Sequence, residues 1–235
     1  FHVTEKNGLR CSTAVGYLNP VKKRNNLKIE VRAHTKRIIF KGLKADSVEY
    51  WQDNEVKKVR CNKEIILSAG SISSPHILQA SGIGPAEIIN SKGIDVIKNV
   101  EAVGKNLHDH LMLRPVYKVK NIYTLNQLSH SYYRKFLVGL EYLFFRSGPM
   151  TMGASQLCGF TKSDPSLATP NLQFHVAPMS ADKLGGATLH KFPAFTPTIS
   201  NIRPTSRGQI SIASNDTRVD PLITMNYLST DEDKK

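Results

Sequence analysis

The sequence contains few cysteines, and their placement excludes two classes of small, cross-linked protein. Three cysteines, Cys11, Cys61 and Cys158, occur among 235 residues. They are odd in number, widely separated and never in a CxxC pair, so neither a disulfide framework nor a zinc site of cysteine ligands is expected. We expect reduced thiols that pack as small core residues.

Long hydrophobic runs are also missing. The best candidate, Phe136–Phe145, contains Glu141 and falls short of the roughly 18 apolar residues that a membrane helix needs. The opening FHVTEKNGLR lacks a basic segment followed by an apolar one, so no secretory signal is predicted. We expect a cytoplasmic protein with no transmembrane segment. A start at Phe1 and an acidic ending directly after Leu228 suggest a piece of a longer polypeptide.

Acidic residues are outnumbered: 19 Asp and Glu face 32 Lys and Arg, for a formal net charge of +13. Such an excess invites a nucleic-acid interpretation, because clustered cations bind phosphate chains by counterion release. The densest basic run is only Lys22–Arg24, and no stretch interleaves basic with aromatic residues. We therefore expect no nucleic-acid partner. A non-catalytic module that binds polyanions through its basic surface remains the alternative function, and steep salt dependence would reveal it.

The first half of the chain predicts a short helix followed by a β-meander. A helix over Ser12–Leu18 would be capped by Ser12 or Thr13 and stopped by Asn19-Pro20. Alternating or continuous apolar residues then predict strands at short intervals, the last of them buried. These strands cover residues 27–33, 37–40, 47–51, 56–59 and 64–67.

A second region begins near Leu113. Apolar residues spaced three and four apart predict a helix over Tyr133–Phe144 that ends at Gly148-Pro149 and turns its aromatic stripe to the core. Strands are predicted at residues 156–160, 172–176, 198–202, 209–213 and 222–225. The mixture of elements indicates the α+β class.

The stretch GSISSPHILQASGIG, Gly70–Gly84, gathers glycines and serines around an apolar segment. It predicts a tight turn at Ala69-Gly70 and a helix whose cap and first turn are Ser73-Ser74-Pro75, with a left-handed end at Gly82. Such a helix start offers free backbone N–H groups to an anionic or electron-rich cofactor. The same residues also serve as simple architecture, so the pattern alone leaves both interpretations open. A second helix is predicted from Pro85 to Gly93.

The stretch resembles the second signature of the glucose-methanol-choline (GMC) family of flavin-dependent alcohol oxidoreductases. The matching residues are Gly70, Ser74-Pro75, Ile77-Leu78 and Ser81-Gly82-Ile83-Gly84. Val103–His110 is similar to a further family loop, VGxNLxDH. Other similar segments are Arg10, Ser12, Tyr17–Pro20, Arg24–Leu27, Arg203–Gly208, Ile210, Ser214 and Pro221–Leu228. The resemblance thus runs nearly end to end, and it is strongest toward bacterial choline and alcohol dehydrogenases.

The resemblance implies an FAD cofactor and two domains, both partial. Residues 1–112 would form the α/β flavin-binding part, an incomplete Rossmann-like domain, and residues 113–235 an antiparallel-sheet substrate domain. Thr35 would contact adenine through its main chain in the second of two paired strands, and Ser47 replaces a glycine common in relatives, which questions the local turn. The implied cofactor-binding residues are Thr35, Ser68, Ala69, Gly70, Ser74, Asn106, Asp109 and His110. The last three would hold a loop shut near the flavin through side-chain to backbone bonds.

The resemblance also shows what chemistry is missing. Family members oxidise a primary alcohol to an aldehyde with a histidine base near the C-terminus, and none of the eight histidines here matches that motif. The family's N-terminal GxGxxG fingerprint is absent too, which equally disfavours a nicotinamide dehydrogenase. We therefore expect no catalytic residue in this segment. It would bind FAD poorly and would not turn over its small-molecule alcohol substrate by itself.

Four other candidates have ordinary explanations. His108-Asp109-His110 offers too few ligands for a metal, and a third from His130 or His175 has no spacing cue, so no metal site is expected. His76 is expected at the surface or in a supporting role. His175 is expected as a half-exposed strand residue, with a place in a substrate cavity as the alternative. Arg207 is expected to pin a hairpin turn or to pair with a carboxylate.

Overall fold

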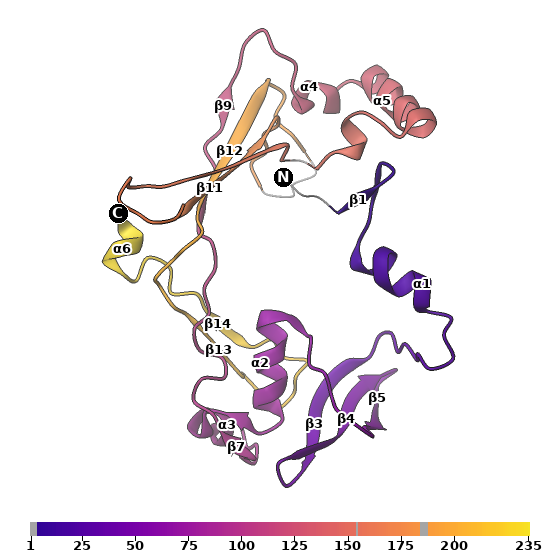
Figure 1. The fold of residues 1–235 in the computed structure, drawn as a ribbon, viewed down its shortest axis with the longest axis vertical. Coiled ribbons are helices and arrows are strands. Elements are labelled where there is room, and N and C mark those ends of the chain that lie inside the picture. The colour runs from indigo at the N-terminus through magenta and orange to yellow at the C-terminus, as the bar shows by residue number, and fades with distance from the viewer. Residues whose placement is uncertain (1–3, 154, 184–187) are drawn as a thin grey trace. The chain divides into compact units, whose positions relative to one another are not determined.

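A computed structural model of the chain describes residues 4–153, 155–183 and 188–235. The chain divides into two compact units, each made of two separate segments. Unit 1 comprises Phe1–Lys28 and His110–Arg203, and unit 2 comprises Ile29–Asp109 and Pro204–Lys235. Each unit therefore combines residues from both sides of the boundary expected between residues 112 and 113. Figure 1 shows the elements of both units.

Unit 2 contains a three-stranded antiparallel sheet in the order β3-β4-β5. The strands are β3 (His34–Lys41), β4 (Lys44–Gln52) and β5 (Glu55–Arg60), which confirms the strands predicted at 37–40, 47–51 and 56–59. Tight turns join them, with positive φ at Gly42 and at Asp53-Asn54, as two-residue hairpins require. Ser47 lies inside β4 and is fully buried, so it occupies no turn.

Two predicted strands do not form. Residues 27–33 are irregular, and residues 64–67 pair with no other segment in the described part of the chain. The expected burial of the second is also wrong, since Ile66 is 77% exposed. A strand needs a neighbour to receive its main-chain hydrogen bonds, and apolar patterning cannot supply one.

Helix α2 (Gly70–Ala80) begins at Gly70, earlier than the predicted cap at Ser73-Ser74. Pro75 therefore lies inside the helix rather than in its first turn, where its missing N–H leaves the Ser71 carbonyl without the usual helical donor. The predicted end is confirmed, because Gly82 has φ +83° and a Cβ there would lie 2.4 Å from the Asp95 carbonyl oxygen. Only glycine fits this close approach.

Other short elements complete unit 2. Helix α3 (Ala86–Ser91) starts after Pro85 and ends before Gly93, as predicted, and β6 (Ile83–Gly84) pairs in parallel with β7 (Lys98–Asn99). From the C-terminal segment come β13 (Gln209–Ser211), its antiparallel partner β14 (Leu222–Thr224), and α6 (Asp231–Lys234). The buried apolar residues are Ile38, Ile77, Ala80, Ile89, Ile210 and Ile212. They place the core where α2 meets β3 and β13.

Unit 1 is built on an antiparallel sheet in the order β10-β11-β12-β8, with β9 also paired to β12. Its strands are β10 (Leu157–Thr161), β11 (Leu172–Ala177), β12 (Ala194–Asn201), β8 (Met112–Leu113) and β9 (Tyr117–Lys118), and a separate hairpin joins β1 (Glu5–Lys6) to β2 (Leu9–Arg10). The three predicted strands at 156–160, 172–176 and 198–202 are confirmed.

The helical segments of unit 1 depart from expectation in two respects. Pro20 begins a further turn, α1 (Asn19–Val21), after the π-helical η1 (Ala14–Leu18), because proline is well accommodated at a helix start. Helix α5 (Tyr132–Phe145) forms as predicted, but its aromatic stripe is not core: Phe144 is 70% exposed and none of its residues is buried. The remaining short segments are α4 (Leu125–Ser129) and η2 (Pro149–Thr151).

Two expectations from composition can be compared with the structure. Cys11, Cys61 and Cys158 are free, as predicted, although each is half-buried rather than in the core. Among the described residues, no helix combines the length and the hydropathy that crossing a membrane requires.

Candidate functional site

A cavity of about 380 Å³ opens at the N-terminus of α2. It is lined by Ser71 and Pro75 of the helix, by the loop Gly104–His108, and by Ile210. Gly70, the first helical residue, has φ +85°, and a Cβ placed on it would meet no atom within 4 Å. No side chain of the described residues caps the helix at Ala69. Free N–H groups of the first turn are therefore available beside open space.

The loop Gly104–His108 is fixed to β13 by main-chain hydrogen bonds. Ile210 N donates to Gly104 O over 2.7 Å, and Leu107 and Gly208 exchange bonds of 3.1 and 2.6 Å. Gly104 has φ +88°, and a Cβ there would lie 2.1 Å from the Ile210 carbonyl oxygen. The two backbones approach so closely that no side chain fits between them.

Asn106 lies on this loop, and Asp109 directly follows it, as the sequence predicts. Asn106 lines the cavity from a left-handed conformation, with φ +60°, and its carbonyl lies 3.0 Å from His108 Nδ1. Asp109 accepts a 2.8 Å hydrogen bond from the Tyr227 hydroxyl, so its partner is a side chain rather than the predicted backbone. That hydrogen bond, together with burial and the carboxylate charge, raises the pKa of Tyr227.

The other predicted cofactor residues fall into three groups. Ser68 and Ala69 are exposed just before α2, and Ser74 is half-buried within it. Thr35 lies in β3, the first strand of its sheet rather than the second, and does not line the cavity; its carbonyl accepts from Thr217 Oγ1 over 2.9 Å. His110 belongs to unit 1. The structure thus brings together the start of α2 and Asn106.

The sequence reasoning missed Gln79, which is fully buried on α2. Its Nε2 donates to Val103 O over 3.2 Å and to Ile210 O over 3.1 Å. Its Oε1 accepts from Ile212 N over 2.6 Å. The available signal was a long polar side chain between apolar helix residues, Leu78 and Ala80. Gln79 therefore links α2 to Val103, which precedes the loop, and to the segment Ile210–Ile212, to which the loop is bonded.

His76 corrects another expectation. It is 5% exposed instead of lying at the surface, because its face of α2 is turned toward the interior of unit 2. Its Nε2 has no hydrogen-bond partner among the described residues. Burial lowers the pKa of His76, and the nearby His34 lowers it further by a smaller amount, despite the opposing charge of Asp220. The ring is therefore neutral at pH 7.

A larger cavity, of about 540 Å³, lies at the opposite end of α2, beside Ala80 and Ser81. Lys36 and Arg218 both contact the ring of Trp51 there, at 4.9 and 4.2 Å from its centroid. Arg218 also forms an ion pair of 2.6 Å with Asp216, and its hydrogen bonds lower the pKa of that carboxyl to about 2. With this guanidinium already neutralised, the cavity shows no clear preference for an anion.

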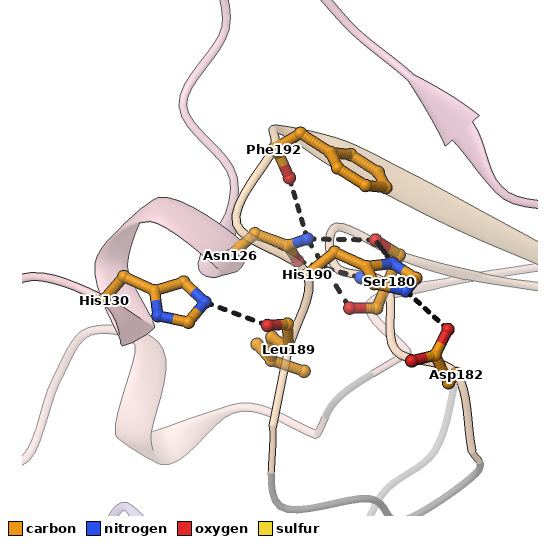
Figure 2. A network of polar contacts seen from close by, with 7 residues as sticks. All are labelled: Asn126, His130, Ser180, Asp182, Leu189, His190 and Phe192. Atoms are coloured by element: carbon orange, nitrogen blue, oxygen red, sulfur yellow. Dashed lines mark hydrogen bonds and ion pairs between the residues drawn. The ribbon is translucent and has the colours of Figure 1, made fainter.

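Figure 2 shows a polar network in unit 1 that resembles a catalytic triad. Ser180 Oγ lies 2.9 Å from His190 Nδ1, and His190 Nε2 lies 2.9 Å from Asp182. Asn126 is fully buried; its Nδ2 donates to Ser180 Oγ and Phe192 O over 2.9 Å each, and its Oδ1 accepts from Ser180 N. Ser180 is only 1% exposed, so no substrate reaches its hydroxyl. The network holds Ser180, Asp182, His190 and Phe192 together around Asn126, and its buried serine does not act as a nucleophile.

The remaining candidates behave as ordinary structure. Arg207 donates to the carbonyls of Pro204 and Ser206, at 2.6 and 3.0 Å, and thus braces the irregular stretch before β13, but no hairpin turn forms there. His175 is half-buried in β11 opposite Cys158 and Thr198. No three His, Cys, Asp or Glu residues in the described ranges lie close enough together to hold a metal ion.

Comparison with known proteins gives the family. Residues 1–112 match the family model described as GMC oxidoreductase. The chain is 37% identical over 231 residues to an oxygen-dependent choline dehydrogenase of Stenotrophomonas maltophilia, covering 98% of this chain and 41% of that protein. The corresponding enzyme of Serratia proteamaculans is 37% identical over 233 residues, with the same coverage. The chain therefore belongs to the GMC oxidoreductase family.

Solved structures agree on the fold. The formate oxidase of Aspergillus oryzae RIB40 superposes with a TM-score of 0.85 at 24% identity, covering 97% of this chain and 44% of that one. The mixed helices and sheets described above are thus those of the GMC fold. The region of the family model matched by residues 1–112 is its FAD-binding region. The chain spans about two fifths of the length of the curated relatives it matches.

Proposed function

We propose that these residues form the middle part of an FAD-dependent oxidoreductase that oxidises a primary alcohol to an aldehyde. The observation that carries the proposal is the cavity between the first turn of α2 and the loop Gly104–His108. A helix start with free N–H groups, open space over Gly70 and a polar loop opposite suits an electron-rich, partly anionic group. These residues fit FAD.

Each part of the site has a separate task in this proposal. The N–H groups after Ala69 and Gly70 hold polar oxygens of the cofactor, Asn106 closes the cavity from the loop, and the main chain of Thr35 contacts the adenine end. When bound, FAD supplies the acceptor for the hydride of the alcohol carbon. The cavity walls Pro75, Leu107 and Ile210 exclude water from one side.

The proposal assigns the catalytic base to polypeptide outside these residues. The relatives are more than twice as long as the matched segment. Among the described residues, His108 is the one histidine that lines the cavity, and its Nδ1 faces the Asn106 carbonyl. We accordingly expect unit 2 to contribute to an FAD-binding domain with a Rossmann-like core, and the sheet of unit 1 to a substrate domain.

The test uses the full-length protein that contains these residues. We expect it to purify with flavin absorbance that bleaches anaerobically when a small primary alcohol such as choline is added, while residues 1–235 alone show weak FAD binding and no turnover. A full-length protein without flavin, or with flavin that no alcohol reduces, contradicts the proposal. Steeply salt-dependent binding to random DNA at physiological ionic strength would instead favour the polyanion-binding module.

A further inference from the structure

One buried side chain, Gln79, determines where the loop Gly104–His108 stands relative to α2. The helix and the loop form opposite walls of the cavity, and Gln79 reaches across between them. Its amide group is completely buried, and both of its donated bonds and its accepted bond go to main-chain atoms. A shift of the helix therefore moves the loop with it.

The surrounding glycines make this link stiff. A Cβ on Gly104 would lie 2.6 Å from Gln79 Nε2, and a Cβ on Gly84 would lie 3.0 Å from Gln79 Cγ. The amide thus occupies a slot that only glycine backbones leave open. The half-buried carbonyl of Val103 and the buried carbonyl of Ile210 both accept from this amide, so removing it leaves two acceptors without their donor at the base of the loop.

We propose that Gln79 is a positioning residue for the flavin: it sets the width of the cavity and thereby the placement of Asn106 against the bound cofactor. This inference rests on the function proposed above. Gln79 itself does not line the cavity and touches no reacting atom. Its effect is transmitted through Gly104 and the main-chain bonds that join the loop to β13.

The experiment compares two matched variants of the full-length protein. Gln79→Met keeps the length of the side chain and removes every hydrogen bond of the amide in unit 2. Asn126→Leu does the same to the fully buried amide of unit 1, which bonds to Ser180 and Phe192. The measurements are the FAD dissociation constant of the apoprotein, the visible circular dichroism of bound flavin, and hydrogen exchange of residues 103–109.

We expect Gln79→Met to weaken FAD binding at least tenfold, to change the flavin dichroism, and to speed exchange selectively in residues 103–109. We expect Asn126→Leu to change the FAD constant less than twofold. Equal FAD constants and spectra for the parent and a folded Gln79→Met overturn the inference, and so does an equal loss in both variants. If Gln79→Met does not fold, Gln79→Glu, which keeps the acceptor for Ile212 N, is measured against the same criteria.

The two proposals fail in different ways. If the unmodified full-length protein binds no FAD, the function proposed above is wrong and the inference falls with it. If the parent binds FAD and the Gln79 variants bind it unchanged, only the positioning role is wrong.

Discussion

Each unit of the molecule contains a fully buried side-chain amide that bonds to the main chain, and only the amide of unit 1 also bonds to a side chain. Gln79 in unit 2 bonds only to main-chain atoms and stands between glycines. Asn126 in unit 1 bonds to the main chain of Ser180 and Phe192 and also to the Ser180 hydroxyl. That hydroxyl contacts His190, and His190 in turn contacts Asp182. Gln79 therefore fixes main-chain segments beside a cavity, whereas Asn126 connects main-chain segments to a group of polar side chains.

The largest effect is expected where the backbones are closest. Gly104→Ala places a Cβ 2.1 Å from the Ile210 carbonyl in a left-handed conformation, so it should lower the free energy of unfolding by about 3 kcal/mol or more. Urea unfolding measures this. The control, Gly139→Ala in α5, meets no atom within 4 Å and should instead stabilise the chain by about 0.5–1 kcal/mol. Equal behaviour of the two variants would show that the backbone contact is unimportant.

Replacing each buried amide by an apolar side chain tests the comparison of the two units directly. Gln79→Met and Asn126→Leu should each reduce stability by about 2–3 kcal/mol, because each leaves buried main-chain or hydroxyl groups without partners. Gln156→Met, at an exposed amide, should change stability by less than about 0.5 kcal/mol. A much smaller loss for one of the buried amides, measured by thermal unfolding, would break the parallel between the units.

A smaller, pH-dependent effect is expected at the C-terminal end of unit 2. Asp233 accepts from the N–H groups of Thr205 and Ser206, at 2.8 Å each. Burial raises its pKa, but hydrogen bonds from Ser206 and Thr205 outweigh this and lower the pKa well below its usual range. The carboxylate therefore contributes stability above the ordinary Asp pKa of about 3.9, and this contribution is lost as the pH falls through the lowered value.

Asp233→Asn should accordingly lower the urea midpoint at pH 7 and at pH 5 alike. The difference from the parent should shrink only in strong acid, below the range where an ordinary Asp titrates. A difference that vanishes already at pH 5 would contradict the lowered pKa. Asp231→Asn, on the exposed side of the same short helix, is the control and should show little dependence on pH.

The smallest effect on stability is expected at the hydrogen bond between Tyr227 and Asp109, just after the loop Gly104–His108. Tyr227 donates to Asp109, and its raised pKa means that this bond is present below about pH 10 and lost as the pH rises through the raised value. Tyr227→Phe should cause a slight loss of stability at pH 8 and should remove the alkaline step that the parent shows. The control is Tyr132→Phe, at a tyrosine that is 90% exposed. In a series of stability measurements at alkaline pH it should keep the stability of the parent at pH 8 and the parent's alkaline step.

Much of the architecture could be predicted from local pattern. The β3-β4-β5 hairpins and the strands of unit 1 alternate visibly, and turn residues mark their ends, so short-range signals suffice. Residues 64–67 and the stripe of α5 have equally clear apolar patterns but no partner in the described residues. Pattern reports which side chains are apolar, and it does not report whether another element covers them.

The candidate site was predictable only in part. Gly70 and Asn106 were identified through motif resemblance; Asn106 lines the cavity, and Gly70 directly precedes Ser71, which lines it too. Gln79 and Tyr227 were missed because Ile210, a partner of Gln79, and Asp109, the partner of Tyr227, each lie more than a hundred residues away along the chain, where no spacing rule connects them. His76 was misplaced for a related reason: which face of α2 is covered depends on β3 and β13, not on the helix sequence.

The main-chain hydrogen bonds that hold the loop Gly104–His108 have a practical consequence for engineering. Since the loop is anchored through carbonyl and amide groups of the peptide chain, the identities of the two exposed side chains contribute little to its anchorage. A combinatorial library that randomises position 108, limits position 106 to residues that accept its left-handed backbone, and retains Gly104 and Gly208 should therefore yield mostly folded proteins whose pocket chemistry varies from clone to clone.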